Sequence, residues 1–309
     1  MHIIRRPRAE DAAAIHELSA ACDVAALGVS DTTLGDIEEV LAEPKLDLDQ
    51  DAWLAHDADG RLLAWAWAVG LGDSDLVEIE VSVRPGVDGL AERLWPVVLE
   101  RARELARERG HDTATVDVVA YRADETKRAL ARKYGFEPST SFSRMRIDFD
   151  GPVEPPAEPP GLTLHTGLSD EVRREAHRVQ QEGFADHYGF VPSDYDLWFE
   201  RRQQQSANDW SQLILARIDG RPAAMVHGND QFVIDQQCGY VATLAVLPDF
   251  RGRGLGKLLL RRAFAADAAR GRKGTILHVD SNNVTPALGL YESAGMRPVL
   301  TIDVWRRKI

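Results

Sequence analysis

Apolar and polar positions along the chain form two series with the same order, 160 residues apart. Apolar runs within 53–67 flank Asp59-Gly60, and apolar runs within 213–226 flank Asp219-Gly220. Asp-Gly between two apolar runs is typical of a tight turn that joins two strands. Each series is therefore expected to contain a β-hairpin at the same place.

Further matches at the same offset indicate a duplicated domain. Residues 130–136 match 290–296, and the two series end in alternating, strand-like tails at 141–147 and 301–307. Three similarities at one offset predict an internal repeat. Within each half the pattern predicts strand, helix or helices, hairpin, strand, long helix, strand, helix and strand.

The second half contains the clearest strand-to-helix pair. Residues 240–247 form an apolar run that ends at Pro248, as expected of a buried strand. Helical spacing then places five residues on one face: Leu255, Leu258, Leu259, Ala263 and Ala266. The predicted fold class is α/β.

Prolines mark the boundary between the halves. Residues 152–161 read PVEPPAEPPG, and prolines in this density cannot continue a helix or a central strand. The predicted organisation is a first domain at 1–150, a linker at 151–161 and a second domain at 162–309.

Composition narrows the classes of partner. The 309 residues carry a formal net charge of -12, which disfavours sequence-independent nucleic-acid binding. No apolar run is long enough for a signal peptide or a membrane span, so no membrane partner is expected. Cys22 and Cys238 have neither disulfide-framework nor metal-ligand spacing, so we expect a cytoplasmic protein without a bound metal.

A glycine-rich segment lies where the predicted strand gives way to the helix. Gly252, Gly254 and Gly256 alternate with other residues there. Such glycines allow a ligand to approach the backbone, and the free N–H groups at a helix start favour an anion such as phosphate. The spacing matches neither the Walker loop nor the Rossmann fingerprint.

The segment does resemble a known family. R-G-x-G-x-G after V-x-P is similar to the pyrophosphate loop of the GNAT superfamily of acyl-CoA N-acyltransferases. After a predicted strand, residues 283–296 read N-x-x-x-A-x-x-L-Y-x-x-x-G-M, which is similar to a second GNAT pattern, N-x-x-A-x-x-L-Y-x-x-x-G-[FM]. The resemblance implies two tandem GNAT-like domains, each a mixed, mostly antiparallel sheet flanked by helices.

The resemblance also implies how acetyl-CoA would be held as co-substrate. Leu244, Ala245 and Val246 would pair with the pantetheine arm, and their N–H groups would polarise the thioester carbonyl. Asn283 would bond the pantetheine region. The pyrophosphate would lie against Arg251, Gly252, Arg253, Gly254, Leu255, Gly256 and Lys257.

For catalysis, the resemblance implies that a neutral amine attacks the thioester directly in a ternary complex. Tyr291 occupies the position of the acid that protonates the departing thiolate. The general base stays unassigned. Relatives often place a Glu on the fourth strand, where this chain has Tyr240, and His227, Asp230 and Asp235 are alternatives that would act through water.

A polar and aromatic segment follows the first helix of the second half. In this superfamily the region forms part of the acceptor pocket, so Asp186, His187 and Tyr188 are candidate acceptor contacts, together with Tyr240. A surface turn rich in aromatic residues is an equally good interpretation of 184–190.

The first half lacks the corresponding chemistry. Its loop is shorter and carries Asp88, which would repel phosphate, while Ala131 and Ala123 stand where Tyr291 and Asn283 do. We therefore expect a non-catalytic first domain. A weakened N-terminal and an active C-terminal domain resemble the plan of tandem GNAT proteins such as the mycothiol synthases.

The leading hypothesis is an acetyl-CoA-dependent N-acetyltransferase whose acceptor is a primary amine of a small molecule. The alternatives are acetylation of a peptide or protein and a non-catalytic acyl-CoA-binding protein. The retained Tyr291 argues against pure binding, which needs no leaving-group acid. Either a monomer or a homodimer is compatible with two domains in one chain.

Overall fold

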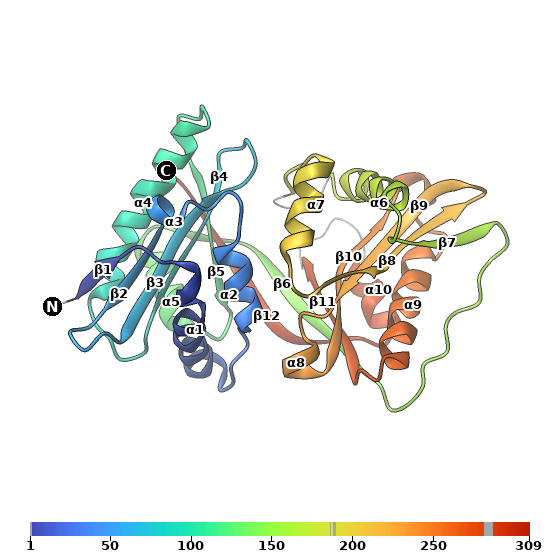
Figure 1. Cartoon of the computed structure of the whole chain (residues 1–309), viewed down its shortest axis with the longest axis horizontal. Coiled ribbons are helices and arrows are strands. Elements are labelled where there is room, and N and C mark those ends of the chain that lie inside the picture. The colour runs from blue at the N-terminus through green and yellow to red at the C-terminus, as the bar shows by residue number, and fades with distance from the viewer. Residues whose placement is uncertain (1, 186, 188–189, 281–286) are drawn as a thin grey trace. The chain divides into compact units, whose positions relative to one another are not determined.

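The computed structural model describes residues 2–185, 187, 190–280 and 287–309. The chain divides into two compact units (Figure 1). The first unit comprises Met1–Ser141 together with Ile302–Ile309, and the second comprises Phe142–Thr301.

The first unit begins with a short strand and a layer of helices, followed by a hairpin and a long helix. Its elements are β1 (Ile3–Arg5), η1 (Ala9–Asp11), α1 (Ala12–Leu27), α2 (Leu34–Leu41), α3 (Leu48–Asp51), β2 (Ala52–His56), β3 (Leu62–Gly70), β4 (Leu76–Val83), α4 (Leu90–Glu108), β5 (Thr115–Tyr121), α5 (Glu125–Lys133) and β6 (Glu137–Asp148), whose second part belongs to the other unit.

The second unit repeats this order. Its elements are β7 (Leu162–Thr166), α6 (Asp170–Gly183), α7 (Tyr195–Gln204), β8 (Asn208–Ile218), β9 (Arg221–Asn229), α8 (Val233–Gln236), β10 (Cys238–Val246), η2 (Pro248–Phe250), α9 (Leu255–Ala269), β11 (Gly274–Asp280), α10 (Ala287–Ser293) and β12 (Arg297–Lys308), whose second part belongs to the first unit. The predicted element order is confirmed in both halves.

Each unit has a mixed sheet in which most neighbouring strands are antiparallel. The strand order is β1-β2-β3-β4-β5-β12 in the first unit and β6-β11-β10-β9-β8-β7 in the second. Only β4 with β5 and β10 with β11 are parallel among the described pairs within the units. The predicted fold class, a mixed and mostly antiparallel sheet flanked by helices, is confirmed.

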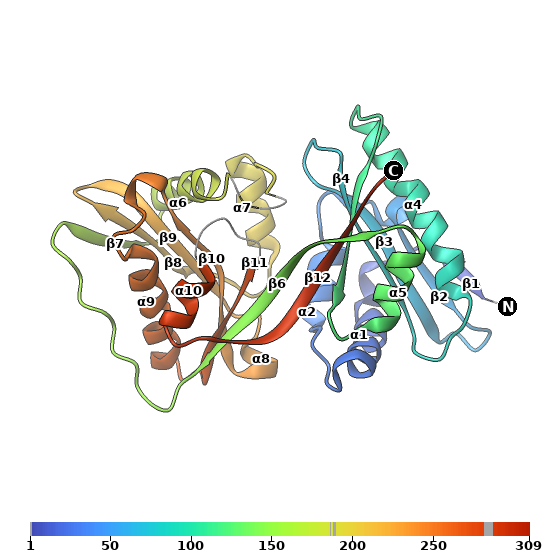
Figure 2. The ribbon, with the colours of Figure 1, turned by 180° about the vertical axis from the view of Figure 1, so that it is seen from behind.

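Helices cover both faces of each sheet (Figures 1 and 2). In the second unit, Leu255, Leu259 and Phe264 of α9 pack against Val226 and Leu277 on one face. On the other face the side chains of α6 and α7 pack against β8, β9 and β10, and this cluster comprises Val172, Ala176, Val179, Trp198, Leu213, Leu215, Met225 and Ala245. The face of α9 differs in part from the prediction, because Ala266 is exposed and Asp267 is buried.

The strands that close the two halves are exchanged between the units. The second part of β6 pairs with β11 from Phe142 opposite Asp280 to Asp148 opposite Gly274. The second part of β12 pairs with β5 from Ile302 opposite Tyr121 onward. The compact units therefore differ from the predicted halves, in which each domain ends with its own strand.

The two predicted hairpins are present, with different turns. Asp219 and Gly220 both have positive φ, +48° and +77°, and Ile218 faces Arg221 across the turn. This is the geometry of a two-residue type I′ turn. In the hairpin turn of the first unit, Gly60 has φ of +85° and Asp59 is not in the positive-φ region. A longer loop closes there through the Asp57 N–H, which donates to the Arg61 carbonyl.

None of the helices in the described parts of the chain combines the length and the apolar character that crossing a membrane would require.

Candidate functional site

Strand β10 leaves its parallel neighbour part-way along its length. In the ladder with β9, Val241 lies opposite Gly228 and Thr243 opposite His227, so Ala242 is an extra residue that forms a β-bulge. The parallel pairs with β11 end at Val241 and Leu277, although β10 continues to Val246. Among the described residues, the segment from Leu244 to Val246 therefore has no partner in β11 and presents an edge that an extended ligand arm can pair with.

The loop after β10 leaves the first backbone N–H groups of α9 accessible to an anion. Gly252 and Gly254 have φ of +75° and +78°, a region that favours glycine, and a Cβ at either position would meet nothing within 4 Å. Gly254 is the N-cap residue of α9, so the first N–H groups of a long helix open onto an exposed glycine loop. Such N–H groups and the helix dipole favour a phosphate.

Three cationic side chains surround this helix start without a carboxylate partner in the described part of the chain. Arg251 donates to the carbonyls of Val246 and Gly183, at 3.2 and 3.1 Å. Arg253 and Lys257 likewise donate to backbone carbonyls, of Asp249 at 3.1 Å and of Ser293 at 2.8 Å. Their charges are thus available to an external anion, as expected of a pyrophosphate site.

Tyr291 lies on α10 within the apolar cluster on the α9 side of the sheet. The side chain is 9% exposed, and burial raises the pKa of its phenol to about 12. Leu290, beside it in the sequence, lies 3.4 Å from the position of a Cβ at Gly256, so α10 packs closely against the start of α9. A phenol with a raised pKa is protonated at neutral pH and is able to donate a proton.

Tyr240 takes part in a chain of hydrogen bonds across β10, β11 and β6. Its hydroxyl lies 2.9 Å from Nδ1 of His278, and Nε of Arg144 donates to Nε2 of the same ring at 3.0 Å. Because the guanidinium can only donate, Nε2 is an acceptor and the hydrogen of neutral His278 resides on Nδ1. Arg144 comes from the exchanged part of β6 and is 7% exposed.

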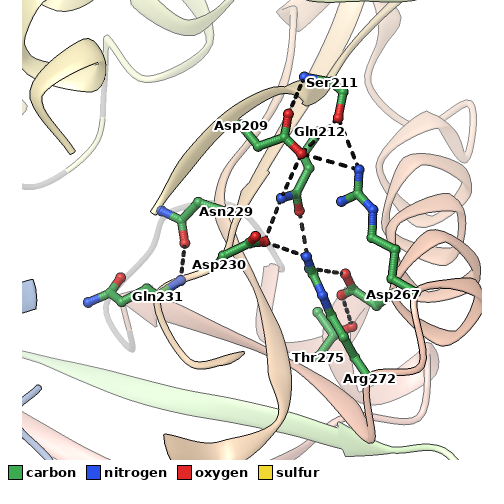
Figure 3. Close-up of polar contacts among 10 residues, drawn as sticks. Asp209, Ser211, Gln212, Asn229, Asp230, Gln231, Asp267, Arg272 and Thr275 are labelled. Carbon is green, nitrogen blue, oxygen red and sulfur yellow. Dashed lines mark hydrogen bonds and ion pairs between the residues drawn. The ribbon is translucent and has the colours of Figure 1, made fainter. Parts of the chain in front are cut away.

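The three alternative base candidates have different surroundings. His227 is buried beside Arg202, and burial lowers the pKa of its imidazole to about 3. Asp230 accepts from Gln212 at 2.6 Å and is ion-paired with Arg272, in the polar network of Figure 3. Asp235 is exposed on α8.

The same network stabilises the end of α9. Arg272 also pairs with Asp267 at 2.6 Å, and Thr275 donates to that carboxylate (Figure 3). A Cβ at Gly239 would lie 2.2 Å from Asp267, so glycine is required at the start of β10. We therefore assign this network a structural role.

Several predicted site residues fall outside the described part of the chain: Asp186, Tyr188 and Asn283. Of the predicted acceptor segment, His187 is described; its ring packs on Phe184 with centroids 4.3 Å apart. In the described parts of the chain, no group of three or more His, Cys, Asp or Glu side chains is arranged to hold a metal ion.

The corresponding region of the first unit is built differently. The β4–β5 pairs end at Ile79 and Val118, but the β3–β4 register has no bulge. Lys127 of α5 pairs with Glu80 of β4 at 2.6 Å, and so links the two elements that correspond to α10 and β10. Ala131, the counterpart of Tyr291, is fully buried in the core.

Comparison with known proteins finds a family match in the second half of the chain. Residues 174–296 match the model described as the Acetyltransferase (GNAT) family, which spans the β10 bulge, the glycine loop and Tyr291. The second half of the chain therefore carries a GNAT acetyltransferase domain. The fold of the whole chain is that of tandem GNAT structures.

Two curated relatives are similar to most of the chain. Mycothiol acetyltransferase of Thermobifida fusca is 29% identical over 76% of both chains. The protein of the same name from Thermobispora bispora is 29% identical over 82% of both.

Solved structures agree with this assignment. A GCN5-related N-acetyltransferase from Sphaerobacter thermophilus is 26% identical, with a TM-score of 0.78 over 99% of this chain and 95% of that one. A tandem GNAT protein from the clavulanic acid biosynthesis pathway is 19% identical, with a TM-score of 0.75 over 100% and 98% of the two chains, and shares the fold.

The GNAT motifs do not predict a group of polar residues on the α6–α7 face of the sheet, opposite to the face that α9 covers. Arg202 of α7, Gln180 of α6 and His227 of β9 contact one another there. No motif links these positions in the sequence. The only signal in the sequence is His227, a candidate base whose position gives no indication of a neighbouring arginine.

Proposed function

We propose that this protein transfers the acetyl group of acetyl-CoA to the primary amine of a small molecule. The observation that carries the proposal is the divergence of β10 from β11 next to a cation-rich helix start. The diverging edge suits the extended pantetheine arm, and the helix start suits the pyrophosphate. The names of the curated relatives favour a small acceptor over a protein.

In this proposal the acetyl-CoA contacts are divided between backbone and side chains. N–H groups within 244–246 pair with the pantetheine arm and donate to the thioester oxygen as negative charge develops on it. Arg251, Arg253 and Lys257 hold the pyrophosphate with the N–H groups of 252–256. Asn283 keeps its predicted role in binding the pantetheine region.

The chemical step is direct attack within a ternary complex. The lone pair of the neutral amine forms a bond to the thioester carbon, and the carbon–sulfur bond then breaks. The nitrogen releases its extra proton to water, and a proton from water restores the phenol of Tyr291 after each turnover. Tyr291 gives its proton to the departing thiolate, because its buried phenol is the protonated form at neutral pH. We propose that the first half of the chain has no acetyl-transfer site of its own, since Asp88, Ala123 and Ala131 replace the groups that the step needs.

Calorimetry with acetyl-CoA tests the proposal. We expect one site per chain, lost in Arg251→Glu, because the substitution places a carboxylate where the pyrophosphate would lie. Arg261→Glu is the matched control: it makes the same charge change at an exposed position further along α9 and should bind normally. Absence of binding would refute the proposed function, and two sites would refute the inactive first half.

A further inference from the structure

Arg202 lies near the end of α7 with only neutral partners. Its Nε donates to Nδ1 of His227 at 3.3 Å, and its Nη2 donates to Oε1 of Gln180 at 3.1 Å. The Trp198 ring lies beneath the guanidinium, with 4.2 Å from Cζ to the ring centroid. Burial and the neighbouring Arg201 lower the pKa of Arg202 to about 10, yet the group stays charged at neutral pH.

Two other buried or half-buried arginines of the same unit form ion pairs with carboxylates. Arg272 pairs with Asp230 and Asp267, and Arg217 pairs with Glu175 at 2.8 Å. Arg202 forms no ion pair within the described part of the chain. A desolvated charge without a counterion is costly, so an anion from outside the chain would relieve a cost that the fold carries.

His227 provides a second donor beside this arginine, and no acceptor meets that donor with normal hydrogen-bond geometry. The residue is 3% exposed, and the Trp210 ring stacks on its imidazole with centroids 5.4 Å apart. Because Nδ1 accepts from Arg202, the hydrogen of the neutral ring resides on Nε2. Nε2 is buried without a hydrogen bond of normal geometry, and the backbone of Asp209 lies beside the imidazole as a polar contact.

Two independent contacts place this pair beside the proposed acetyl-CoA strand. His227 faces Thr243, the residue directly after the β10 bulge, in the β9–β10 register. On α6, one turn after Gln180, a Cβ at Gly183 would lie 3.1 Å from Cβ of Ala245 and 3.7 Å from N of Val246. Arg202 is therefore held on the α6–α7 face, close to where the thioester is proposed to lie.

We propose that Arg202, oriented by Gln180 and His227, binds a carboxylate of the amine acceptor. The inference rests on the proposed function and specifies its substrate class: a primary amine that also carries a carboxylate. One guanidinium and one neutral imidazole supply a single positive charge, which matches a monoanionic carboxylate rather than a phosphate dianion. Binding energy from this non-reacting group would orient the amine toward the thioester.

Titration of the full chain with sodium propionate tests the carboxylate site without requiring turnover. The probe signal is the imidazole ¹⁵N resonances of His227, assigned by their loss in His227→Asn. We expect a saturable shift with propionate and none with propionamide or with sodium chloride at equal ionic strength. We expect propionate to bind about tenfold or more weakly to Arg202→Gln, because a charge-assisted contact is lost.

Two variants separate binding from a structural effect. Arg178→Gln is the matched control, since Arg178 is an exposed arginine of the neighbouring α6, and should bind propionate normally. Arg202→Lys retains the charge but not the planar fork, so its affinity should fall between those of wild type and Arg202→Gln. No shift of His227 in the wild type, an equal shift with propionamide, or unchanged binding in a folded Arg202→Gln would each overturn the carboxylate site.

Acetyl-CoA calorimetry on the same samples distinguishes this failure from failure of the proposed function. A chain that binds acetyl-CoA but not propionate retains the proposed function and refutes the carboxylate site. A chain that binds propionate but not acetyl-CoA retains the carboxylate site and refutes the proposed function. With both bound, β-alanine should be acetylated in preference to β-alaninamide, and that preference should disappear in Arg202→Gln.

Discussion

Burial sets the protonation of two side chains on opposite faces of the second sheet. It raises the pKa of Tyr291 to about 12 and lowers that of His227 to about 3. Both shifts favour the neutral form, because a low-dielectric surrounding penalises charge. A protonated phenol and a neutral imidazole are therefore both present across the physiological range.

Tyr291→Phe should lower kcat about 100-fold, because general acid catalysis by a positioned group contributes at least that factor. Acetyl-CoA affinity should change little, since the substitution removes one hydroxyl and retains the buried ring. Steady-state kinetics and calorimetry on the same protein measure the two quantities. Tyr134→Phe, which removes a phenol from the first unit, is the control; an unchanged kcat in Tyr291→Phe would refute the role of the acid.

His227 should make the protein sensitive to mild acid. Its pKa is about 3 in the folded chain, against 6.5 for an unperturbed imidazole. The unfolded chain therefore binds more protons between these values, so the free energy of unfolding falls as pH falls through that window. From pH 6.5 to pH 5 the expected loss is about 2 kcal/mol.

Urea unfolding at pH 6.5 and at pH 5 measures this loss. His227→Asn has no imidazole to protonate, so its free energy of unfolding should change less between the two pH values than that of the wild type. His165→Asn should behave as the wild type does. Equal changes in the wild type and in His227→Asn would contradict the assignment of this acid sensitivity to His227.

At the scale of elements, one strand and one helix start determine where ligands can bind. The bulge at Ala242 lets β10 leave β11, and the glycines after β10 bring the chain round to the first N–H groups of α9. The β3–β4 ladder of the first unit has no such bulge. The difference in register supports the proposal that only the second half transfers acetyl groups.

Gly254→Ala should weaken acetyl-CoA binding and also lower the free energy of unfolding by about 1 kcal/mol, because the residue has φ of +78°. Gly271→Ala is a close control: Gly271 follows α9, has φ of +76°, and a Cβ there would also meet nothing within 4 Å. The two variants should lose similar stability, measured by urea unfolding, and only Gly254→Ala should lose acetyl-CoA affinity. Equal affinities would contradict a ligand at the start of α9.

The sequence predicts the elements and the loop but not the features that depend on pairing between distant strands. Asp219-Gly220 adopts positive φ at both residues because the turn is specified by its own two residues. The bulge at Ala242 depends on which β9 residue faces it, and the contact of Arg202 with His227 depends on how α7 packs on β9. Likewise, spacing alone placed Ala266 on the buried face of α9, where the structure has Asp267 bonded to Arg272 and Thr275.

At the scale of the whole molecule, the exchanged strands make each unit depend on residues from the other half of the sequence. β6 supplies Met145, which is fully buried in the second unit, and Arg144, which holds His278. β12 supplies Trp305 to the core of the first unit and pairs Arg306 with Asp117 at 2.6 Å. A division at the proline-rich segment would remove these contacts from both sheets.

Two fragments test this dependence. The fragment 142–301 contains every strand of the second unit, whereas 162–309 lacks β6 and leaves β11, from Gly274 to Asp280, as an unpaired edge. Loss of the buried Met145 alone should cost about 2–5 kcal/mol, and an exposed strand edge promotes aggregation. We therefore expect 142–301 to show a cooperative thermal transition and to bind acetyl-CoA, and 162–309 to show a lower transition temperature or to aggregate. Equal stability of the two fragments would mean that β6 is dispensable to the second sheet, and that 162–309 is the folding unit that its sequence alone predicts.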